Sequence, residues 1–470
     1  MGATFTVKEV LDTTGGTLIS GRPDSTFTGI TIDSRRVEGG ELFVAILGKR
    51  LDGHDFVPEA LMRGARGVIV QKELSGIQHE AAVILVSDTT KALGDLAHAV
   101  RGRFGGPVIA ITGSSGKTTT KEMVVSILER RKQVHKTEGN LNNLIGVPLT
   151  LFGLADGQDV LVLELGTNQP GEIARLAEIV SPTIACITNI GPAHLEGLGS
   201  LEGVAREKGA LFNFLGPDGT AVINRDDPFL REMGEKLACR VVTYGRMKGA
   251  KVTLEKEVKM DKTGSFFRLV VEDRSQEVVL PIPGAHNVSN ALAAAAIAWA
   301  AGATMEDIVA GLEEMRAVPG RMEIVALENG VNLINDVYNA NPASCEAALN
   351  TLKQMMGEGR GFVILGDMLE LGEEAPERHR FIGELLTGIN IEKAYLKGDL
   401  VRFIAEGARE KGWGEEKITF FGEVREVVGD ISRLLKPGDW ILVKGSRGMK
   451  MEEVVRALVD VLERKKGGEG

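Results

Sequence analysis

Cysteine is scarce in this sequence: its 470 residues include three, Cys186, Cys239 and Cys345. They are far apart and odd in number, which argues against a disulfide framework and against a metal site of the CxxC type. Such usage fits a reducing compartment, so we expect a cytoplasmic protein. The N-terminal residues also lack the charged stretch followed by an apolar stretch that marks a signal peptide.

Long apolar runs and an excess of positive charge are missing too. The longest run of small apolar residues, Ala291 to Ala303, is too short for a bilayer core of about 30 Å, and it predicts a buried helix. The net charge is −10 and no basic stripe is present, which argues against a nucleic-acid binder. We expect neither membrane insertion nor nucleic-acid binding, and a monomer would suffice for an enzyme.

What remains is an ordinary globular composition, 43% apolar and 26% charged, over a length that suggests about three domains. The stretch Arg101–Pro107 has the composition of a linker, and Val318-Pro319-Gly320 that of a second boundary. We therefore expect an N-terminal domain over 1–104, a central domain over 105–318 and a C-terminal domain over 319–470.

The hydrophobic patterns predict an α/β protein in all three parts. In the central part, apolar strands such as PVIAITG, DVLVLELG and TIACITNIG alternate with amphipathic helices, which indicates a mainly parallel sheet of the P-loop type with helices on both faces. Residues 250–281 alternate like antiparallel hairpins, and a helical region follows from Asn287 to about Arg316. We expect a small α/β domain before this part and a Rossmann-like α/β domain after it, where VNLIND, GFVILGD, KAYLKGD and DWILVKGS each end a strand.

A glycine-rich turn links the first central strand to its helix and predicts an ATP-binding loop. Gly113, Ser114, Ser115 and Gly116 would bring backbone N–H groups close to phosphate oxygens, and Thr119 continues the loop into the helix. Lys117 would reach the β- and γ-phosphates, and the Thr118 hydroxyl would bind Mg²⁺. The match to GxxxxGK[ST] is imperfect, because Ile111 stands where the first glycine belongs.

Two further side chains follow central strands and could face the same crevice. Glu164 ends LVLELG, and a carboxylate there could hold Mg²⁺ or merely cap a loop. His194 lies just after the next strand, although Mg²⁺ prefers oxygen ligands. Lys208 lies on an expected helix, where a lysine is normally a solvated charge.

Segments from all three parts together resemble the Mur ligases, the cytoplasmic ATP-dependent amide-bond ligases of peptidoglycan synthesis. They include TGSSGKTTTK, LELGTNQPGEI, NIGPAHLEGLGS, PGAHNVSNALAA, NDVYNANPAS and LGDMLELGEE. NANPAS and LGDMLELGE are the most specific, and they resemble the member that acts last in the series. That resemblance implies ATP and Mg²⁺, with UDP-N-acetylmuramoyl-tripeptide and D-alanyl-D-alanine as substrates. The third residue of the tripeptide could be diaminopimelate or lysine.

The resemblance also implies roles for single residues, with Lys117, Lys208 and His194 as the catalytic set. Glu164, His194 and Thr118 would bind Mg²⁺, and Lys208, carbamylated by CO₂, would become an anion that helps to hold a second Mg²⁺. The nucleotide would contact Asn287 and Asn290 at the adenine, Arg321 at the phosphates and Asp336 at the ribose. The substrates would contact Ser34 and Arg35 at the UDP end, Thr137, Asn140 and Asn143 at the muramoyl-peptide end, and Asn339, Asn341, Lys444, Ser446 and Arg447 near the incoming dipeptide.

Three alternatives stay open at this point. One is another ligase of the superfamily, either the Mur ligase that adds the third residue or folylpolyglutamate synthetase. The loop Asn339-Ala340-Asn341-Pro342-Ala343-Ser344 and the N-terminal segment, which resembles a UDP-binding domain, argue against both. In the ligase that adds the third residue, the loop typically reads Asp-Asn-Pro-Arg. The second alternative is a P-loop switch or motor ATPase. A GTPase-type switch would show Asn-Lys-x-Asp, which is not present, and a Walker-B strand would normally end in Asp and not in Glu164. The third is a binding protein without catalysis, against which the presence of the whole catalytic set argues.

Overall fold

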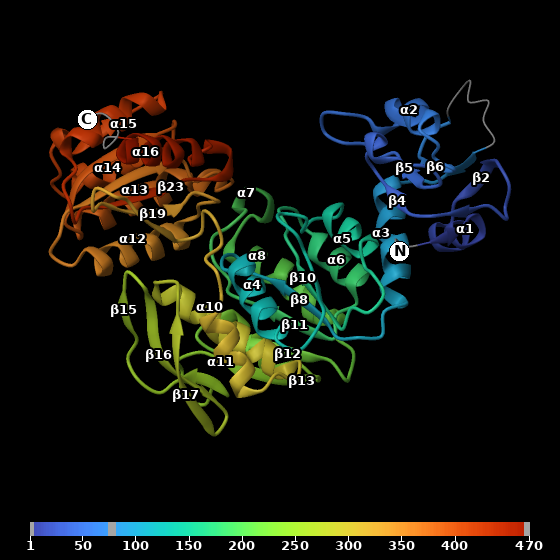
Figure 1. Cartoon of the computed structure of the whole chain (residues 1–470), viewed down its shortest axis with the longest axis horizontal. Coiled ribbons are helices and arrows are strands. Elements are labelled where there is room, and N and C mark those ends of the chain that lie inside the picture. Colours follow the sequence, from blue (N-terminus) through green and yellow to red (C-terminus); the bar gives the residue numbers. More distant parts are fainter. Residues whose placement is uncertain (1–3, 74–80, 465–470) are drawn as a thin grey trace.

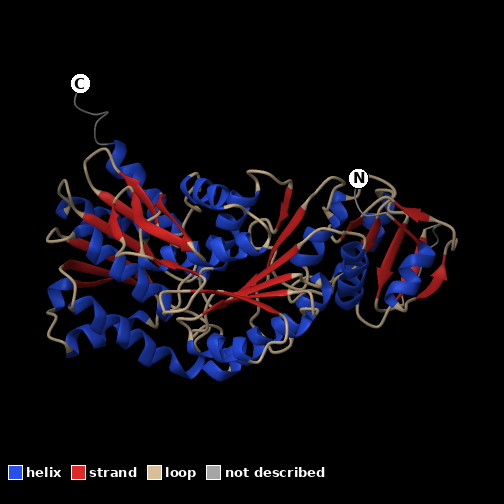
Figure 2. Ribbon diagram, turned by 90° about the horizontal axis from the view of Figure 1, so that it is seen from below, coloured by secondary structure: helices blue, strands red, loops and turns tan. Residues whose placement is uncertain are grey.

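The structure is a computed structural model that describes residues 4–73 and 81–464. Three α/β domains follow one another along an elongated molecule, with the N-terminal and C-terminal domains at opposite ends of the central one (Figure 1). Helices cover the sheets of the central and C-terminal domains (Figure 2). None of the helices in the described ranges is long and apolar enough to cross a membrane.

The N-terminal domain is built on a five-stranded sheet in the order β2-β7-β6-β5-β4. Strand β2 is antiparallel to β7 and the other pairs are parallel. It contains strands around Phe43 and Ile84 and a six-residue helix around Ala60, in keeping with the small α/β domain expected there. The elements are β1 (Phe5–Thr6), α1 (Val7–Thr14), β2 (Thr17–Ser20), β3 (Thr26–Phe27), β4 (Ile30–Thr31), β5 (Leu42–Val44), α2 (Val57–Met62), β6 (Gly67–Val70), β7 (Ala82–Leu85) and α3 (Thr89–Gly102).

The central sheet contains ten strands, of which β9, β10, β8, β11, β12, β13 and β14 lie side by side in parallel. Its middle strands are buried along their whole length, as their near-continuous apolar sequences predict. The elements are β8 (Val108–Thr112), α4 (Lys117–Leu128), β9 (Val134–Lys136), α5 (Gly146–Phe152), β10 (Val160–Glu164), α6 (Glu172–Val180), β11 (Ile184–Ile187), α7 (Leu195–Leu198), α8 (Leu201–Gly209), β12 (Thr220–Asn224), α9 (Pro228–Glu235), β13 (Arg240–Tyr244) and β14 (Val252–Leu254).

An antiparallel extension follows, as the alternating pattern of residues 250–281 predicts. Strands β15 (Lys259–Asp261), β16 (Gly264–Val271) and β17 (Arg274–Leu280) continue the sheet beyond β14. The expected helical region is two helices, α10 (Ala285–Ala300) and α11 (Met305–Glu313). They separate at Gly302, whose φ of 86° ends the first helix, and at Thr304, which caps the second in a capping box with Asp307.

The C-terminal domain holds a six-stranded sheet in the order β18-β19-β23-β20-β21-β22, parallel except at β18. All four strands predicted from the sequence are present, and β18 and β22 extend the sheet. The elements are β18 (Glu323–Ala326), β19 (Asn332–Asp336), α12 (Pro342–Met356), β20 (Gly361–Gly366), α13 (Ala375–Thr387), β21 (Ile391–Lys397), α14 (Val401–Glu410), β22 (Ile418–Phe420), α15 (Val424–Leu434), β23 (Trp440–Lys444) and α16 (Glu452–Arg464).

Helix α3 joins the N-terminal domain to the central one. Arg101 donates hydrogen bonds to the carbonyls of Val180 and Ser181 at the end of α6, at 2.7 and 2.9 Å. Asp95 of α3 pairs with Arg175 of α6, which also donates to the carbonyl of Lys91. Because these contacts combine backbone acceptors with a charge pair, they set the orientation of the two domains as well as joining them.

Candidate active site

The expected phosphate loop connects buried strand β8 to helix α4 at the carboxyl edge of the central sheet. Gly113 and Gly116 have φ values of 149° and 77°, a region that side chains with a Cβ rarely adopt. A Cβ at Gly113 would collide with the Thr188 hydroxyl, and one at Gly116 with the Asn290 amide. Both glycines are therefore required by the backbone and by close packing, as in loops that admit a phosphate.

The residue that breaks the expected motif lies in the strand and not in the loop. Ile111 is fully buried in β8, where it pairs with Glu164 of β10 and Cys186 of β11. The left-handed turn begins two residues later, at Gly113. A glycine at position 111 is therefore unnecessary for this loop, which explains the imperfect match.

The loop after β11 holds the phosphate loop in place. Asn189 accepts a hydrogen bond from the Ser115 N–H at 3.0 Å, and the Thr188 hydroxyl donates to the Ser115 carbonyl at 2.6 Å. The Ser114 hydroxyl donates to the carbonyl of Gly191 and accepts from its N–H, both at 2.9 Å. These contacts were not predicted from the sequence, because they join residues more than 70 positions apart.

Lys117 is the first residue of helix α4, directly after the glycine-rich turn. Its Nζ donates to the carbonyl of Gly113 at 2.7 Å, which is its only hydrogen bond to the described residues. Burial lowers the pKa of Lys117, against the raising effect of the Glu164 carboxylate and with the lowering effect of Arg321. A half-buried ammonium with one neutral acceptor is suited to receive an anion.

A hydrogen bond joins Thr118 and Glu164, two of the residues predicted to bind Mg²⁺. The Thr118 hydroxyl donates to Glu164 Oε2 at 2.7 Å, and Asn142 Nδ2 donates to the other oxygen at 2.8 Å. The Glu164 N–H is held by the Thr137 hydroxyl at 3.0 Å, and the Thr137 carbonyl accepts from buried Lys121 at 2.5 Å. Sequence reasoning chose Asn140 and Asn143 and missed Asn142, because nothing in the run EGNLNN marks one asparagine over the others.

Arg321 reaches this cluster from the segment before β18. Its Nη2 donates to Thr118 Oγ1 at 2.8 Å, and its guanidinium stacks on the Tyr338 ring with the Cζ atom 3.9 Å from the ring centroid. The buried Nε atom has no hydrogen-bond partner among the described residues. Since buried donors are nearly always paired, this orphan N–H indicates that an acceptor such as a phosphate oxygen belongs beside Thr118.

The donor set at Thr118 fits Mg²⁺ bound together with a nucleotide. No group of three or more His, Cys, Asp or Glu side chains suited to a metal occurs within residues 4–73 and 81–464. Mg²⁺ does not require one, because it commonly binds through one or two protein oxygens, substrate phosphates and water. The Thr118 hydroxyl and the Glu164 carboxylate supply such oxygens.

Lys208 is 1% exposed on α8, contrary to the usual state of a helix lysine. The pKa of Lys208 is lowered to about 7, mainly by burial and also by the nearby charge of Lys117, while Glu207 opposes the shift. Among the described residues, the Lys208 ammonium has no hydrogen-bond or ion-pair partner. The neighbouring Glu207 is occupied by Thr167 and by the N–H groups of Gly171 and Ile173.

His194 is connected to the site through the loop after β11, three residues beyond Gly191. Its Nδ1 lies 2.5 Å from Oε2 of Glu370, which belongs to the C-terminal domain. The contact with His194 lowers the pKa of the Glu370 carboxyl. His194 forms no hydrogen bond with Thr118 or Glu164. Glu370 was not predicted from the sequence, although it lies within the LGDMLELGEE segment.

The residues expected at the adenine and ribose lie next to one another across the domain boundary. Asn287 and Asn290 are buried at the start of α10, and Asn290 donates to Asn287 Oδ1 at 3.2 Å. Asp336, at the end of β19, pairs with Lys444 at 2.5 Å. The ring of His286 lies near this pair, and burial lowers its pKa to about 4.

The expected contacts for the dipeptide are partly engaged within the C-terminal domain. Lys444 is 2% exposed and also donates to the Asn339 carbonyl at 3.0 Å, while buried Ser446 donates to the Ala340 carbonyl. Asn341 caps α12 and donates to the Ser114 carbonyl of the phosphate loop at 3.3 Å. Arg447 is exposed, and its Cζ atom lies 5.5 Å from the centroid of the Tyr338 ring.

The expected contacts for the UDP-linked substrate are spread over two regions. Ser34 is buried and donates to Glu59 at 2.7 Å, whereas Arg35 is exposed and makes a two-pronged contact with Asp33. Exposed Asn140 and Asn143 lie beside the central sheet, where Asn143 Oδ1 accepts from the N–H groups that begin α5. Thr137 is fully buried.

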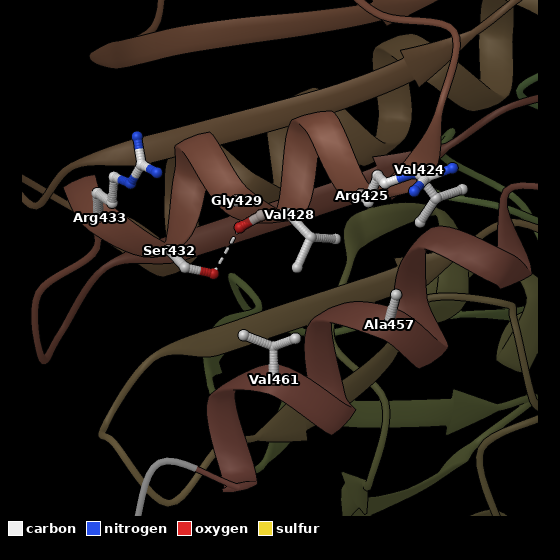
Figure 3. A pocket seen from close by; sticks show the side chains of 8 residues that line it. All are labelled: Val424, Arg425, Val428, Gly429, Ser432, Arg433, Ala457 and Val461. Atoms are coloured by element: carbon white, nitrogen blue, oxygen red, sulfur yellow. Dashed lines mark hydrogen bonds between the residues drawn. The ribbon is translucent and has the colours of Figure 1, made fainter.

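A separate hollow of about 540 Å³ lies between α15 and α16, away from all of these residues. Val424 and Val428 line it from one helix and Ala457 and Val461 from the other (Figure 3). Arg425, Ser432 and Arg433 also line it, but no carboxylate, histidine or cysteine does, so size alone does not make it a catalytic site.

Three family models match successive parts of the chain: the Mur ligase family, catalytic domain, over residues 26–101; the Mur ligase middle domain over 111–298; and the Mur ligase, glutamate ligase domain, over 320–447. The chain belongs to the Mur ligase family.

Among its Mur ligase relatives, the UDP-N-acetylmuramoyl-tripeptide–D-alanyl-D-alanine ligase of Bacillus subtilis (strain 168) is 36% identical over 97% of this chain and 98% of its own length. A crystal structure of MurF from Acinetobacter baumannii superposes with a TM-score of 0.89 at 34% identity, covering 98% of this chain and 99% of that one. MurF ligase from Thermotoga maritima in complex with ADP gives a TM-score of 0.84 at 30% identity, covering 93% and 98%. The fold expected from the sequence is thus confirmed as the three-domain architecture of Mur ligases.

Proposed function

We propose that this chain joins D-alanyl-D-alanine to the terminal carboxylate of UDP-N-acetylmuramoyl-tripeptide, converting ATP to ADP and phosphate. The observation that carries the proposal is the cluster of Lys117, Thr118, Glu164 and Arg321 at the carboxyl edge of the central sheet, in which the buried Arg321 Nε–H has no partner among the described residues. The cluster belongs to a Mur ligase that is related over nearly its full length to ligases of that name. The product would be the UDP-muramoyl-pentapeptide.

Activation of the carboxylate is the first chemical requirement. A carboxylate is a poor electrophile in water, and phosphorylation by the γ-phosphate of ATP gives an acyl phosphate with a good leaving group. The protein contributes position and charge: the loop N–H groups and Lys117 hold the phosphates, and the Arg321 guanidinium neutralises charge beside Thr118. The orphan Nε of Arg321 would then gain its acceptor.

Thr118 and Glu164 would hold Mg²⁺, with His194 as a further ligand. The ion would neutralise phosphate charge when bound. Glu164 is well prepared for this role, because Asn142 and the Thr137 hydroxyl fix its orientation.

Lys208 is suited to carbamylation. Its neutral amine would attack the carbon of CO₂, forming an N–C bond and releasing one proton to solvent. A pKa of about 7 leaves roughly half of the amine neutral at neutral pH, and the carbamate would place a negative charge where the ammonium has no partner. That anion could help to hold a second Mg²⁺.

Attack of the D-alanyl-D-alanine amine on the acyl carbon completes the reaction. The developing oxyanion would be stabilised by the cations around the loop before phosphate leaves. Asn339, Asn341, Ser446 and Arg447 would guide the dipeptide, Ser34 and Arg35 the UDP end, and Asn287, Asn290 and Asp336 the adenosine. Since the acyl phosphate must be kept from water, the domains, divided at about 104 and 318, would close over the substrates.

The cellular location and the oligomeric state are also part of the proposal. Three free thiols and a need for ATP fit a cytoplasmic enzyme, and one chain supplies every residue of the proposed site, so a monomer would act alone.

The decisive test is the substrate dependence of ATP hydrolysis. Phosphate release is measured with three substrate sets: UDP-N-acetylmuramoyl-tripeptide with D-alanyl-D-alanine or single amino acids, the UDP-linked dipeptide with diaminopimelate or lysine, and folate with glutamate. We expect release only from the tripeptide substrate combined with D-alanyl-D-alanine. Equal release with diaminopimelate, lysine or folate plus glutamate would favour another ligase, and release without any amine would favour an ATPase switch.

A further inference from the structure

Two residues other than glycine adopt the left-handed backbone conformation and face each other across the domain boundary. His194 has a φ of 57° in the central domain, and Glu370 has a φ of 64° in the C-terminal domain. This conformation costs a residue with a Cβ about 1–2 kcal/mol. Such residues persist where the surroundings fix them, and they cluster at functional sites.

The segment that carries Glu370 is fixed from both sides. The Glu370 carbonyl accepts from the N–H of Glu196 in α7 at 3.3 Å. On the other side, the N–H of Leu369 donates to the Ser446 hydroxyl at 2.9 Å, just beyond β23. The carboxylate is therefore presented to His194 from a defined place in the C-terminal domain.

Stability does not account for the pairing of these two side chains. The His194 side chain is 23% exposed and that of Glu370 is 51% exposed. An ion pair at such a surface contributes about 0–1 kcal/mol, which is less than the cost of holding two left-handed residues. A role in orienting the imidazole explains the arrangement better.

The contact decides which nitrogen of His194 carries the proton. A carboxylate can only accept, so Nδ1 bears a hydrogen, and in the neutral imidazole the lone pair is then on Nε2. No described residue forms a hydrogen bond with Nε2. This pattern, a carboxylate on one ring nitrogen with the other nitrogen free, is how proteins orient and strengthen histidine ligands of metals.

We propose that Glu370 is a positioning residue that orients His194 Nε2 toward the divalent cation of the active site. The inference rests on the proposed function, in which His194 is a metal ligand. Because Glu370 comes from the C-terminal domain and His194 from the central one, the ligand is oriented only when the two domains are docked. Metal binding and domain docking are therefore coupled.

The test uses Mn²⁺ as a spectroscopic probe on the full chain with ATP. Electron paramagnetic resonance measures the dissociation constant of Mn²⁺, and electron spin echo modulation detects ¹⁴N of a bound imidazole. We expect Glu370→Ala to weaken Mn²⁺ binding about 10–100-fold and to diminish the ¹⁴N modulation. Glu373→Ala is the matched control: Glu373 is exposed in the same segment and has no side-chain contact with the described residues, so both readouts should stay at wild-type values.

A second variant distinguishes the loss of the Glu370 carboxylate from a loss of folding. Glu370→Gly also deletes the carboxylate but relieves the left-handed backbone, so it should fold at least as stably as the wild type and still weaken Mn²⁺ binding. Wild-type affinity and ¹⁴N modulation in both Glu370 variants would overturn the inference.

The His194→Ala variant separates this inference from the proposed metal site. If His194→Ala loses the ¹⁴N signal while the Glu370 variants keep it, the positioning role of Glu370 fails and the ligand role of His194 stands. If His194→Ala keeps the signal and the affinity, His194 is no ligand, and the metal role proposed for it fails together with the inference.

Discussion

Polar residues follow the strands of both the central and the C-terminal domain, but the two domains differ in how many protein partners these residues have. Lys117 and Lys208 are held in the central domain with one neutral acceptor and none, respectively, among the described residues. In the C-terminal domain, Lys444 has both Asp336 and the Asn339 carbonyl, and Ser446 has partners on two sides. A buried cation with fixed partners stabilises the fold, whereas one without them is available to a ligand.

We expect the largest effect on turnover from removing the positive charge of Lys117 beside the phosphate loop. Lys117→Ala should lower the turnover number by about 10³-fold, because the lost charge acts on the phosphate that is being transferred. The free energy of unfolding should change little, since the only hydrogen bond lost is to a loop carbonyl. Turnover by phosphate release and unfolding in urea measure the two quantities.

Lys236→Ala is the control for that change, because Lys236 lies in an exposed pair on α9. It should leave turnover unchanged. Near-normal turnover of Lys117→Ala with D-alanyl-D-alanine would contradict the phosphate role of Lys117.

The second cation of the central domain gives a prediction that depends on pH. Carbamylation needs the neutral amine, and the pKa of Lys208 is about 7, so the neutral fraction falls as the pH drops below 7. We expect activity to decline there and to be partly restored by added bicarbonate, measured as initial rates between pH 6 and 8. Lys208→Gln should be about 10–100-fold less active, in line with loss of a group that supports a metal, and should not respond to bicarbonate.

A rate of the wild-type enzyme that is insensitive to bicarbonate at every pH would count against the carbamate. Arg206→Gln, two residues away on the same helix and exposed, is the matched control and should keep the bicarbonate response.

Lys444 tests the other side of the comparison. Lys444→Met leaves the Asp336 carboxylate, whose side chain is only 13% exposed, without its cation, so the free energy of unfolding should fall by about 3 kcal/mol. Chemical denaturation measures this value. Lys411→Met removes an exposed pair with Glu384 and should cost less than about 1 kcal/mol.

A contact between Lys444 and substrate alone would give the opposite result. Stability would stay near the wild-type value, and the Michaelis constant for D-alanyl-D-alanine would rise. The double variant Lys444→Met with Asp336→Leu separates the two further, since removal of both charges should destabilise the fold less than removal of one.

The sequence predicted the parts of the fold whose signals are local. Apolar strands followed by glycine or polar turns predicted the parallel sheets. The phosphate loop was predicted from consecutive residues, Gly113 to Thr118. The break between α10 and α11 was not predicted, although Gly302 and Thr304 are ordinary end and start signals. The run of alanines before them has no period that shows where one buried helix ends.

The partners of the site residues could not be predicted, because they come from distant parts of the chain. Glu370 reaches His194 over 176 positions, and Arg321 reaches Thr118 over 203. No spacing in the sequence encodes such contacts, and a resemblance between motifs supplies residues without their hydrogen bonds. Asn142, Thr188 and Asn189 were missed for the same reason, since each acts by holding another residue.

We expect the smallest effect on catalysis from replacing Arg35, which lies in the N-terminal domain and so extends the comparison to a third region. Its guanidinium is 78% exposed and is held in place by Asp33 at 2.8 Å through each of two nitrogens. If it binds the UDP end of the substrate, Arg35→Ala should raise the Michaelis constant for the UDP-linked substrate about tenfold, equivalent to about 1.4 kcal/mol, with little change in turnover or stability. Steady-state kinetics with this substrate varied and ATP saturating measure the effect, and Arg22→Ala, an equally exposed arginine paired with Asp24, serves as the control. An unchanged Michaelis constant in Arg35→Ala would reduce the Arg35–Asp33 contact to a surface ion pair.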